Sequence, residues 1–166
     1  ALEKDVDGFH AGSKFSVPVA QAVLKMIETT IINQSLLDYL KSQNITVIGK
    51  GTTAGKPIIN IFKKKGLDIN IIDSKTTNRN EILSSSDIII SAVGKKILGS
   101  SDIKKGVTLI GVGMHTDTFG KLKGDYNEEE IKDKASFFSP TPGGVGPVNV
   151  AMLMKNLVQA SENLSS

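Results

Sequence analysis

The chain is most constrained by a short run of β-prone residues that leads into three closely spaced glycines. Residues 45–48 (Ile-Thr-Val-Ile) are followed by Gly49, Gly51 and Gly55, and then by an apolar run over 58–62 that suits a helix. This pattern predicts a strand, a tight turn and the start of a helix. Such a turn points backbone N–H groups and a helix N-terminus at one place, which suits a phosphate or pyrophosphate group.

The glycine spacing, Gly-x-Gly-x-x-x-Gly, is a loosened form of the dinucleotide-binding fingerprint. It differs from a P-loop, because only three residues separate Gly51 from Gly55 and Pro57 stands where Ser or Thr would hold magnesium. Pro57 suits the first turn of a helix, where its missing N–H is not needed. From the spacing alone two interpretations stay open: a nucleotide site, or an ordinary strand–helix turn whose glycines serve packing.

The remaining pattern predicts alternating strands and helices. Apolar runs without polar alternation suit parallel strands that are covered on both faces. We expect a Rossmann-like, doubly wound α/β fold, with a mainly parallel sheet and helices on both faces, in one domain over 1–166. The expected strands cover 45–48, 68–72, 87–91, 107–112 and 135–139, and the expected helices cover 15–32, 35–42, 54–65, 80–84, 127–134 and 148–163, with loops over 117–125 and 140–147.

Small or polar residues follow the first four predicted strands. These ends are 49–51, Asp73 with Ser74, 92–94 and 113–115. In a doubly wound sheet, ligands bind at the carboxyl ends of the strands. The convergence of four such ends favours the nucleotide interpretation of the glycine turn.

The composition excludes several classes of binding partner. The chain has no cysteine among its 166 residues, so it can form neither disulfides nor thiolate metal sites, and this fits a reducing compartment. The net charge of +3 comes from scattered lysines, with Arg79 as the single arginine, which argues against a nucleic-acid surface. No run approaches transmembrane length, and no signal peptide opens the chain. We expect a cytoplasmic protein without metal, nucleic-acid or membrane partners.

Three motifs resemble one known family, the bifunctional methylenetetrahydrofolate dehydrogenase/methenyltetrahydrofolate cyclohydrolases. They are Lys-Asp-Val-Asp-Gly-Phe-His at 4–10, Val-Ile-Gly at 47–49 with Gly-Lys-Pro at 55–57, and Pro-Gly-Gly-Val-Gly-Pro at 142–147. The stretches 87–95, 112–113 and 120–125 match in order and spacing. The resemblance covers essentially the whole chain, and its proline–glycine loop is the most specific part.

This resemblance implies the NAD(P)-binding C-terminal domain of an enzyme of one-carbon metabolism. In the family, 5,10-methylenetetrahydrofolate gives a hydride to NADP, or to NAD in some members, and the methenyl product is hydrolysed to 10-formyltetrahydrofolate. The folate is shared with an N-terminal domain that carries the catalytic Tyr-x-x-x-Lys and is missing from this chain. The resemblance therefore implies no catalytic residue here, an inactive isolated chain, a homodimer in the full-length enzyme, and a junction to the missing domain formed by 1–13 and 148–166.

The resemblance also implies site residues by position. The cofactor would contact Gly49, Lys50, Gly51, Gly55, Asp73, Ser74, Val93, Gly94, Met114 and Asn149. The folate would contact Asp7, whose carboxylate suits the N–H donors of a pterin, and a cleft wall formed by Gly143, Gly144 and Pro147.

Two departures from the family pattern concern the cofactor. The family's Gly-Arg-Ser turn is Gly49-Lys50-Gly51 here, which weakens phosphate recognition. Asp73 ends the second predicted strand 24 residues after Gly49, where a carboxylate accepts hydrogen bonds from the adenosine ribose. The family default is NADP, whereas Asp73 favours binding of NAD. NADP is favoured by Lys50, Ser74 and Lys75, because each of these side chains can bind a phosphate.

Other interpretations stay open. The chain can be a stand-alone, non-catalytic NAD(P)-binding module, or a Rossmann-like interaction domain that has lost its nucleotide. His10 either lines the folate cleft or lies on a surface loop, and His115 either approaches the nicotinamide or is solvated.

Overall fold

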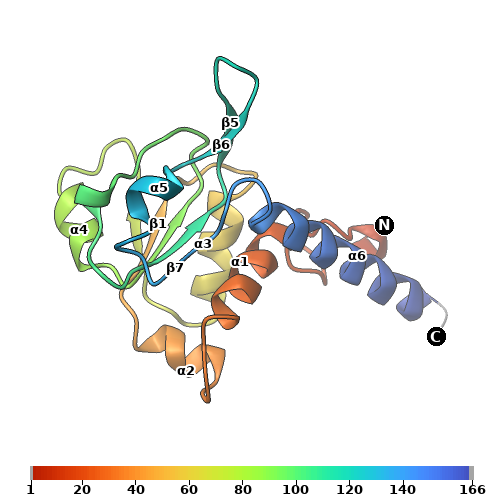
Figure 1. Cartoon of the computed structure of the whole chain (residues 1–166). Helices are drawn as coiled ribbons and strands as arrows, with labels where there is room; N and C mark the ends of the chain where they lie inside the picture. The colour runs from red at the N-terminus through yellow and green to blue at the C-terminus, as the bar shows by residue number, and fades with distance from the viewer. Residues whose placement is uncertain (1, 165–166) are drawn as a thin grey trace.

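A five-stranded, entirely parallel sheet forms the centre of the molecule, shown as a computed structural model that describes residues 2–164 (Figure 1). Its order is β2–β1–β3–β4–β7. The strands are β1 (Ile45–Ile48), β2 (Asn70–Ile72), β3 (Ile88–Ser91), β4 (Thr108–Gly111) and β7 (Phe137–Phe138). Because β2 lies on one side of β1 and all later strands on the other, the winding reverses between β1 and β3. The predicted doubly wound fold is confirmed, and its topological switch point is the β1–β3 edge.

Both faces of the sheet are buried, as the continuous apolar runs predict. Alternate side chains of β1 point to opposite faces: Ile45 and Val47 join one core cluster, and Ile48 joins the other. The first cluster is covered by α1 (Pro18–Glu28), α2 (Leu36–Lys41) and α3 (Gly55–Lys64). The second is covered by α4 (Arg79–Ser85) and α5 (Glu128–Ile131), and Ile103 joins it directly after the 3₁₀ helix η2 (Ser100–Asp102). Figure 1 shows α4 and α5 on the opposite side of the sheet from α1 and α3.

The last helix, α6 (Val145–Leu164), packs along α1 and projects from the body of the molecule (Figure 1). The predicted start at 148 is wrong, because the helix begins three residues earlier at Val145. Pro147 thereby falls in the first turn, where its missing N–H costs no hydrogen bond. On the outer face of α6, Val150, Met154, Leu157 and Val158 are each more than half exposed.

A buried amide attaches the N-terminal segment to α6. The segment begins with a 3₁₀ helix, η1 (Leu2–Lys4). Asn156 is only 2% exposed, and its Nδ2 donates to the carbonyls of Val6 at 2.8 Å and Ser16 at 3.1 Å. Its Oδ1 accepts from Gln21 Nε2 of α1 at 3.1 Å. Asn156 therefore ties Val6 and Ser16 to α6, and Gln21 Nε2 adds a bond of 2.8 Å to Ser16 O.

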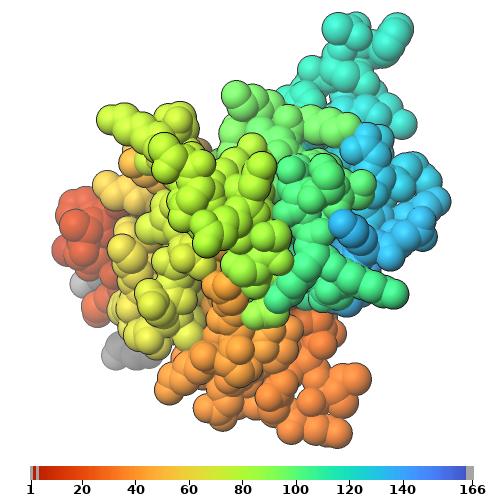
Figure 2. Space-filling view, turned by 90° about the vertical axis from the view of Figure 1, so that its left-hand side faces the viewer, coloured from red at the N-terminus to blue at the C-terminus, as the bar shows by residue number. Residues whose placement is uncertain are grey.

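An antiparallel hairpin of β5 (Met114–Thr116) and β6 (Leu122–Gly124) replaces the predicted loop. It projects clearly from the molecule in Figure 1 and at the top of Figure 2. Its turn is closed by Asp117, whose carboxylate accepts from the N–H groups of Phe119 and Lys121 at 2.9 Å. The strands are too short to show a recognisable alternation in sequence.

Other predicted boundaries are confirmed within a few residues. The largest differences lie at α1, which begins at Pro18 rather than 15 and ends at Glu28 rather than 32, and at α5, which ends at Ile131 rather than 134. Residues 1, 165 and 166 of the predicted domain and junction lie outside the described part. No helix within 2–164 combines the length and apolarity needed to cross a membrane.

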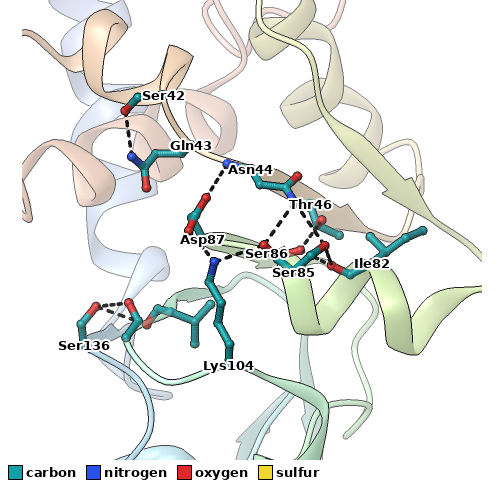
Figure 3. Close-up of polar contacts among 12 residues, drawn as sticks. Ser42, Gln43, Asn44, Thr46, Ile82, Ser85, Ser86, Asp87, Lys104 and Ser136 are labelled. Carbon is teal, nitrogen blue, oxygen red and sulfur yellow. Dashed lines mark hydrogen bonds and ion pairs between the residues drawn. The ribbon is translucent and has the colours of Figure 1, made fainter.

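A polar network joins the amino ends of three strands (Figure 3). The carboxylate of Asp87, just before β3, accepts from the backbone N–H of Asn44 at 2.7 Å and from Lys104 Nζ at 2.5 Å. Asn44 precedes β1 and Lys104 precedes β4. Beside them, the buried hydroxyls of Thr46 and Ser86 are hydrogen-bonded at 2.7 Å. Burial alone raises the pKa of Asp87, but the bonds from Lys104 and Asn44 outweigh it and lower the pKa below its usual value.

We expect Asp87→Asn to reduce the free energy of unfolding at pH 7 by about 1 kcal/mol, because it removes a charged acceptor from a partly exposed site. The pKa of Asp87 is lowered in the folded state, so its stabilisation is complete above the unfolded pKa of about 3.9. It is lost as pH falls through the folded pKa. Urea unfolding of wild type and variant should give curves that converge below pH 4. The exposed Asp68→Asn is the matched control, and a constant difference from pH 7 to pH 3 would contradict this account.

Candidate functional site

The turns that follow β1 and β3 touch through their backbones at the switch point. Gly49 has a φ of +91°, and a Cβ there would lie 2.6 Å from the carbonyl oxygen of Ala92. The N–H of Gly49 donates to Ile72 O of β2 at 2.9 Å. Only glycine can therefore occupy this position, because the left-handed backbone and the close approach both exclude a side chain.

The glycine turn presents an open helix N-terminus. A Cβ at Gly55 would lie 2.2 Å from Gly49 O, so this glycine packs the first turn of α3 against the end of β1. Gly51, in contrast, has no atom within 4 Å of a Cβ position. No side chain within residues 2–164 caps the N-terminus of α3 at Ala54. Within the first turn, the Lys56 N–H donates to Gly51 O at 2.9 Å and Pro57 has no N–H. The positive end of the helix dipole attracts an anion, and the surface at Gly51 leaves room for one.

An ion pair connects the turn to the end of β2. Lys50 Nζ lies 2.5 Å from Asp73 Oδ2. The other carboxylate oxygen accepts from the N–H of Lys75 at 2.9 Å and from the Thr76 hydroxyl at 3.3 Å. The hydrogen bond from Lys50 and that from the Lys75 N–H lower the pKa of Asp73 to about 2. Asp73 is therefore ionised throughout the neutral range, and Ser74 beside it is exposed.

The turn after β3 completes this edge of the sheet. Val93 is 37% exposed and Gly94 has a φ of +77°. Their N–H groups donate to the carboxylate of Asp125 at 3.0 and 2.8 Å. The structure thus brings eight of the predicted cofactor residues to the adjacent turns of β1, β2 and β3: Gly49, Lys50, Gly51, Gly55, Asp73, Ser74, Val93 and Gly94.

The proline–glycine loop lines a separate cavity of about 240 Å³ at the end of β4. Gly143, Gly144 and Pro147 line it together with Met114 of β5. Gly144 packs tightly, since a Cβ would lie 2.4 Å from Pro140 O, whereas Gly143 faces open space with a φ of +103°. Asn149 is half-buried in the first part of α6.

Asp7 does not line this cavity. It is exposed on the segment held by Asn156, and the neighbouring residues Gly8, Phe9 and His10 line a groove of about 440 Å³ against α3. The structure of the described chain therefore separates Asp7 from the other predicted folate residues.

The two histidines lie apart. His10 is exposed in the groove beside α3, and its Nδ1 accepts from the N–H of Gly12 at 3.2 Å. His115 alternates with Met114 along β5, so it faces a different cavity, lined by Lys96 and Asn127. His115 Nδ1 is buried and has no hydrogen-bond partner among the described residues. Within residues 2–164, no three His, Asp or Glu side chains form a group able to hold a metal ion.

Comparison with known proteins identifies the chain's family. Residues 17–165 match the family described as tetrahydrofolate dehydrogenase/cyclohydrolase, NAD(P)-binding domain. The bifunctional protein FolD of Nitrosospira multiformis is 38% identical over 98% of this chain and 58% of its own length. The FolD protein of Methanoculleus marisnigri is 36% identical over 98% of this chain and 59% of its own length.

Solved structures of enzymes from this family superpose on the chain. The FolD methylenetetrahydrofolate dehydrogenase/cyclohydrolase of Campylobacter jejuni superposes with a TM-score of 0.85 at 31% identity, over 96% of this chain and 58% of that one. A Trypanosoma brucei enzyme of the same name, solved with NADP and an inhibitor, gives a TM-score of 0.83 at 26% identity, over 99% of this chain and 60% of that one.

The chain belongs to the tetrahydrofolate dehydrogenase/cyclohydrolase family, as its NAD(P)-binding domain. The resemblance predicted from the sequence is confirmed, and the alternative of a Rossmann-like interaction module is not favoured. The chain spans about 58% of the length of the relatives it matches.

The site fits the cofactor that the family name implies. The uncapped N-terminus of α3 and the open surface at Gly51 suit a pyrophosphate, and Asp73 lies where an adenosine ribose binds in such sheets.

The tyrosines do not offer a general base here. Burial raises the pKa of Tyr126 to about 12, and its hydroxyl donates to Ser139 O at 2.6 Å. Tyr39, within α2, packs against the core.

Two functional candidates were missed by sequence reasoning. Asp125 holds the β3 turn and Asn156 holds the N-terminal segment, and both polar side chains are buried. In the sequence, Asp125 stands out only as the last residue of the 120–125 match. A lone Asp after a glycine is too common a pattern to reveal a buried acceptor.

We expect Gly51→Val to abolish binding of NAD and NADP while the protein stays folded. The added side chain would occupy the approach to the helix N-terminus, but it meets no protein atom within 4 Å of its Cβ. Calorimetric titration and thermal unfolding measure the two effects. The matched control is Gly99→Val, where the backbone is extended at φ −122° and the nearest atom to a Cβ is 3.7 Å away.

Unchanged titrations of Gly51→Val would show that the pyrophosphate does not bind at this turn. Gly55→Ala should behave in the opposite way and lower the free energy of unfolding by more than about 1 kcal/mol, because its Cβ overlaps Gly49 O.

Proposed function

We propose that this chain is the NAD(P)-binding part of a bifunctional methylenetetrahydrofolate dehydrogenase/methenyltetrahydrofolate cyclohydrolase. The observation that carries the proposal is the uncapped N-terminus of α3 beside the open Gly51, at the switch point of a sheet that belongs to this family. The dehydrogenase step oxidises 5,10-methylenetetrahydrofolate, and the cyclohydrolase step opens the methenyl ring to 10-formyltetrahydrofolate.

NAD(P), when bound, would supply the hydride acceptor of the first step, and residues of this chain would hold it in place. The first turn of α3 and Gly51 would bind the pyrophosphate, and Asp73 with Ser74 would bind the adenosine ribose. Val93 and Gly94 would border the nicotinamide end, with Met114 and Asn149 farther along the same edge. The loop of Gly143, Gly144 and Pro147 would form one wall of the folate site.

The rest of the folate site would come from an N-terminal domain. The chain spans about 58% of its relatives, and the outer face of α6 leaves four large apolar side chains more than half exposed. A contiguous apolar face of this kind indicates a surface that another part of the protein covers. We assign it, with 1–13 and the rest of 148–166, to the junction with that domain. Asp7, on the N-terminal segment beside α6, would enter the folate site from this junction.

The whole enzyme would be a homodimer and would act in the cytoplasm. The projecting hairpin supports self-association, because Phe119 at its turn is 93% exposed and Met114 and Leu122 on its strands are 52% and 37% exposed. Exposed apolar groups on a protruding ribbon are suited to an interface between copies.

The isolated chain should bind nucleotide without catalysing either reaction. The purified 166-residue protein should give no absorbance change at 340 nm with methylenetetrahydrofolate and NADP, and no hydrolysis of the methenyl compound, because the family's Tyr-x-x-x-Lys lies outside it. A full-length relative assayed in parallel provides the positive control. Robust turnover by the chain alone would contradict the expectation that catalysis needs the N-terminal domain. If the chain bound neither NAD nor NADP, the proposed function would be wrong.

The geometry around Asp73 bears on the choice between NAD and NADP. A carboxylate at the end of β2 favours the ribose 2′-hydroxyl of NAD and repels the 2′-phosphate of NADP. Lys50 lies against this carboxylate and partly neutralises it, but its ammonium lacks the bidentate fork with which arginine holds a phosphate. We propose that NAD binds at least as tightly as NADP, against the family default.

We expect Asp73→Ser to improve binding of NADP relative to NAD by about tenfold, since a like charge at contact in a partly exposed site costs about 1 kcal/mol or more. The gain should shrink at high salt. Because the pKa of Asp73 is about 2, Asp73 stays ionised from pH 5 to pH 8, and the titrating group in this range is the 2′-phosphate of NADP, whose second pKa is about 6. The repulsion of NADP by Asp73 should therefore grow as pH rises through that value. Competitive calorimetry measures each ratio, with Asp68→Ser as the matched surface control. A tenfold preference of the wild type for NADP, unchanged in the variant, would show that Asp73 does not face the ribose.

A further inference from the structure

A fully buried carboxylate, Asp125, holds the turn after β3. Its exposure is 0%, and both of its oxygens accept hydrogen bonds. Oδ1 accepts from the N–H groups of Gly94 at 2.8 Å and Lys95 at 3.0 Å. Oδ2 accepts from the N–H of Val93 at 3.0 Å and from the Ser91 hydroxyl at 2.6 Å. A buried carboxyl group needs such partners, because an unsatisfied one is costly.

The three N–H donors come from consecutive residues. Successive backbone N–H groups that converge in a turn form an anion-binding concavity of the kind that holds phosphate in many nucleotide sites. Here the protein's own carboxylate fills that concavity. The β3 turn therefore cannot offer its N–H groups to a ligand phosphate, and the uncapped N-terminus of α3 is left for the pyrophosphate.

The same carboxylate lies where the turns of β3 and β4 meet. A Cβ at Gly113, after β4, would lie 2.4 Å from both oxygens of Asp125 and 2.3 Å from the backbone nitrogen of Gly94. On the other side, Ala92 of the β3 turn contacts Gly49 of the β1 turn. The Asp125 carbonyl also accepts from the N–H groups of Ile97 at 2.8 Å and Leu98 at 3.2 Å.

We infer that Asp125 is a positioning residue of the dinucleotide site: it fills the N–H concavity of the β3 turn and orients Val93 and Gly94 toward the cofactor. This role rests on the proposed function, because it assumes that the switch point binds a dinucleotide. Asp125 touches no reacting group itself. It acts through the turn that it holds.

The test is Asp125→Asn in the 166-residue chain, with NADH as the probe and its fluorescence as the readout. The amide keeps the size of the carboxylate, but its NH₂ would face N–H donors and cannot accept from them. We expect the Kd for NADH to rise about tenfold or more, with reduced enhancement of NADH fluorescence. Ser86→Ala is the control: it removes a buried hydroxyl contact at the opposite end of the sheet, so it should lower Tm and leave the Kd within about twofold.

A second measurement uses the wild type, so the proposal can be decided even if Asp125→Asn does not fold. Inorganic phosphate titrated into ¹⁵N-labelled protein should shift the amide resonances of 52–55 and leave those of 93–95 in place. Phosphate-induced shifts at 93–95 would overturn the inference. NADH binding by Asp125→Asn equal to wild type would overturn the positioning role alone, whereas a wild type that binds no NADH or NADPH would overturn the proposed function and the inference together.

Discussion

The binding edge of this sheet depends on backbone contacts that leave no room for a side chain at Gly49 or Gly55. A Cβ at Gly49 would overlap the carbonyl of Ala92, and one at Gly55 would overlap the carbonyl of Gly49. Because these contacts bring the β1 turn, the β3 turn and the start of α3 together, they create one place where helix N–H groups and strand ends converge. The family's cofactor site follows from that convergence, since a dinucleotide needs a pyrophosphate anchor and flanking surfaces for its two ends.

A buried or partly buried carboxylate stabilises each end of the sheet. At the amino ends, Asp87 accepts from the backbone before β1 and from Lys104 before β4. At the carboxyl ends, Asp125 accepts from three successive N–H groups of the β3 turn. Parallel strands leave unpaired backbone donors where they begin and end, and each must find an acceptor. The acceptor at the amino ends connects three strands, and the acceptor at the carboxyl ends holds the β3 turn, which borders the proposed binding surface.

Much of the fold could be predicted, because short apolar runs and the glycines that follow them mark the strands of the sheet. Isoleucine-rich runs such as 88–90 suit only a strand buried on both faces, and Gly49 marks the turn after β1. The hairpin of β5 and β6 could not be predicted, since three-residue strands show no reliable period. The early start of α6 was missed because Val145 and Gly146 read as part of a proline–glycine loop.

The site was predictable where it depends on strand ends and less so where it depends on buried side chains. Gly51 and Asp73 follow strands and could be located from spacing. Asp125 and Asn156 act through hydrogen bonds to segments distant in sequence, Asn156 to Val6 across 150 positions, and no local pattern reports such a contact. Asp7 lies on that distant segment, so its separation from the Gly143–Gly144 loop could not be foreseen either.

The central claim is that the carboxyl edge between β1 and β3 binds a dinucleotide. A crystal structure of this chain grown with NAD or NADP tests it most directly. The account predicts the pyrophosphate at the first turn of α3 beside Gly51, the adenosine ribose beside Asp73, and the nicotinamide end toward Val93 and Gly94. A dinucleotide found instead in the groove between residues 8–17 and α3 would contradict the account.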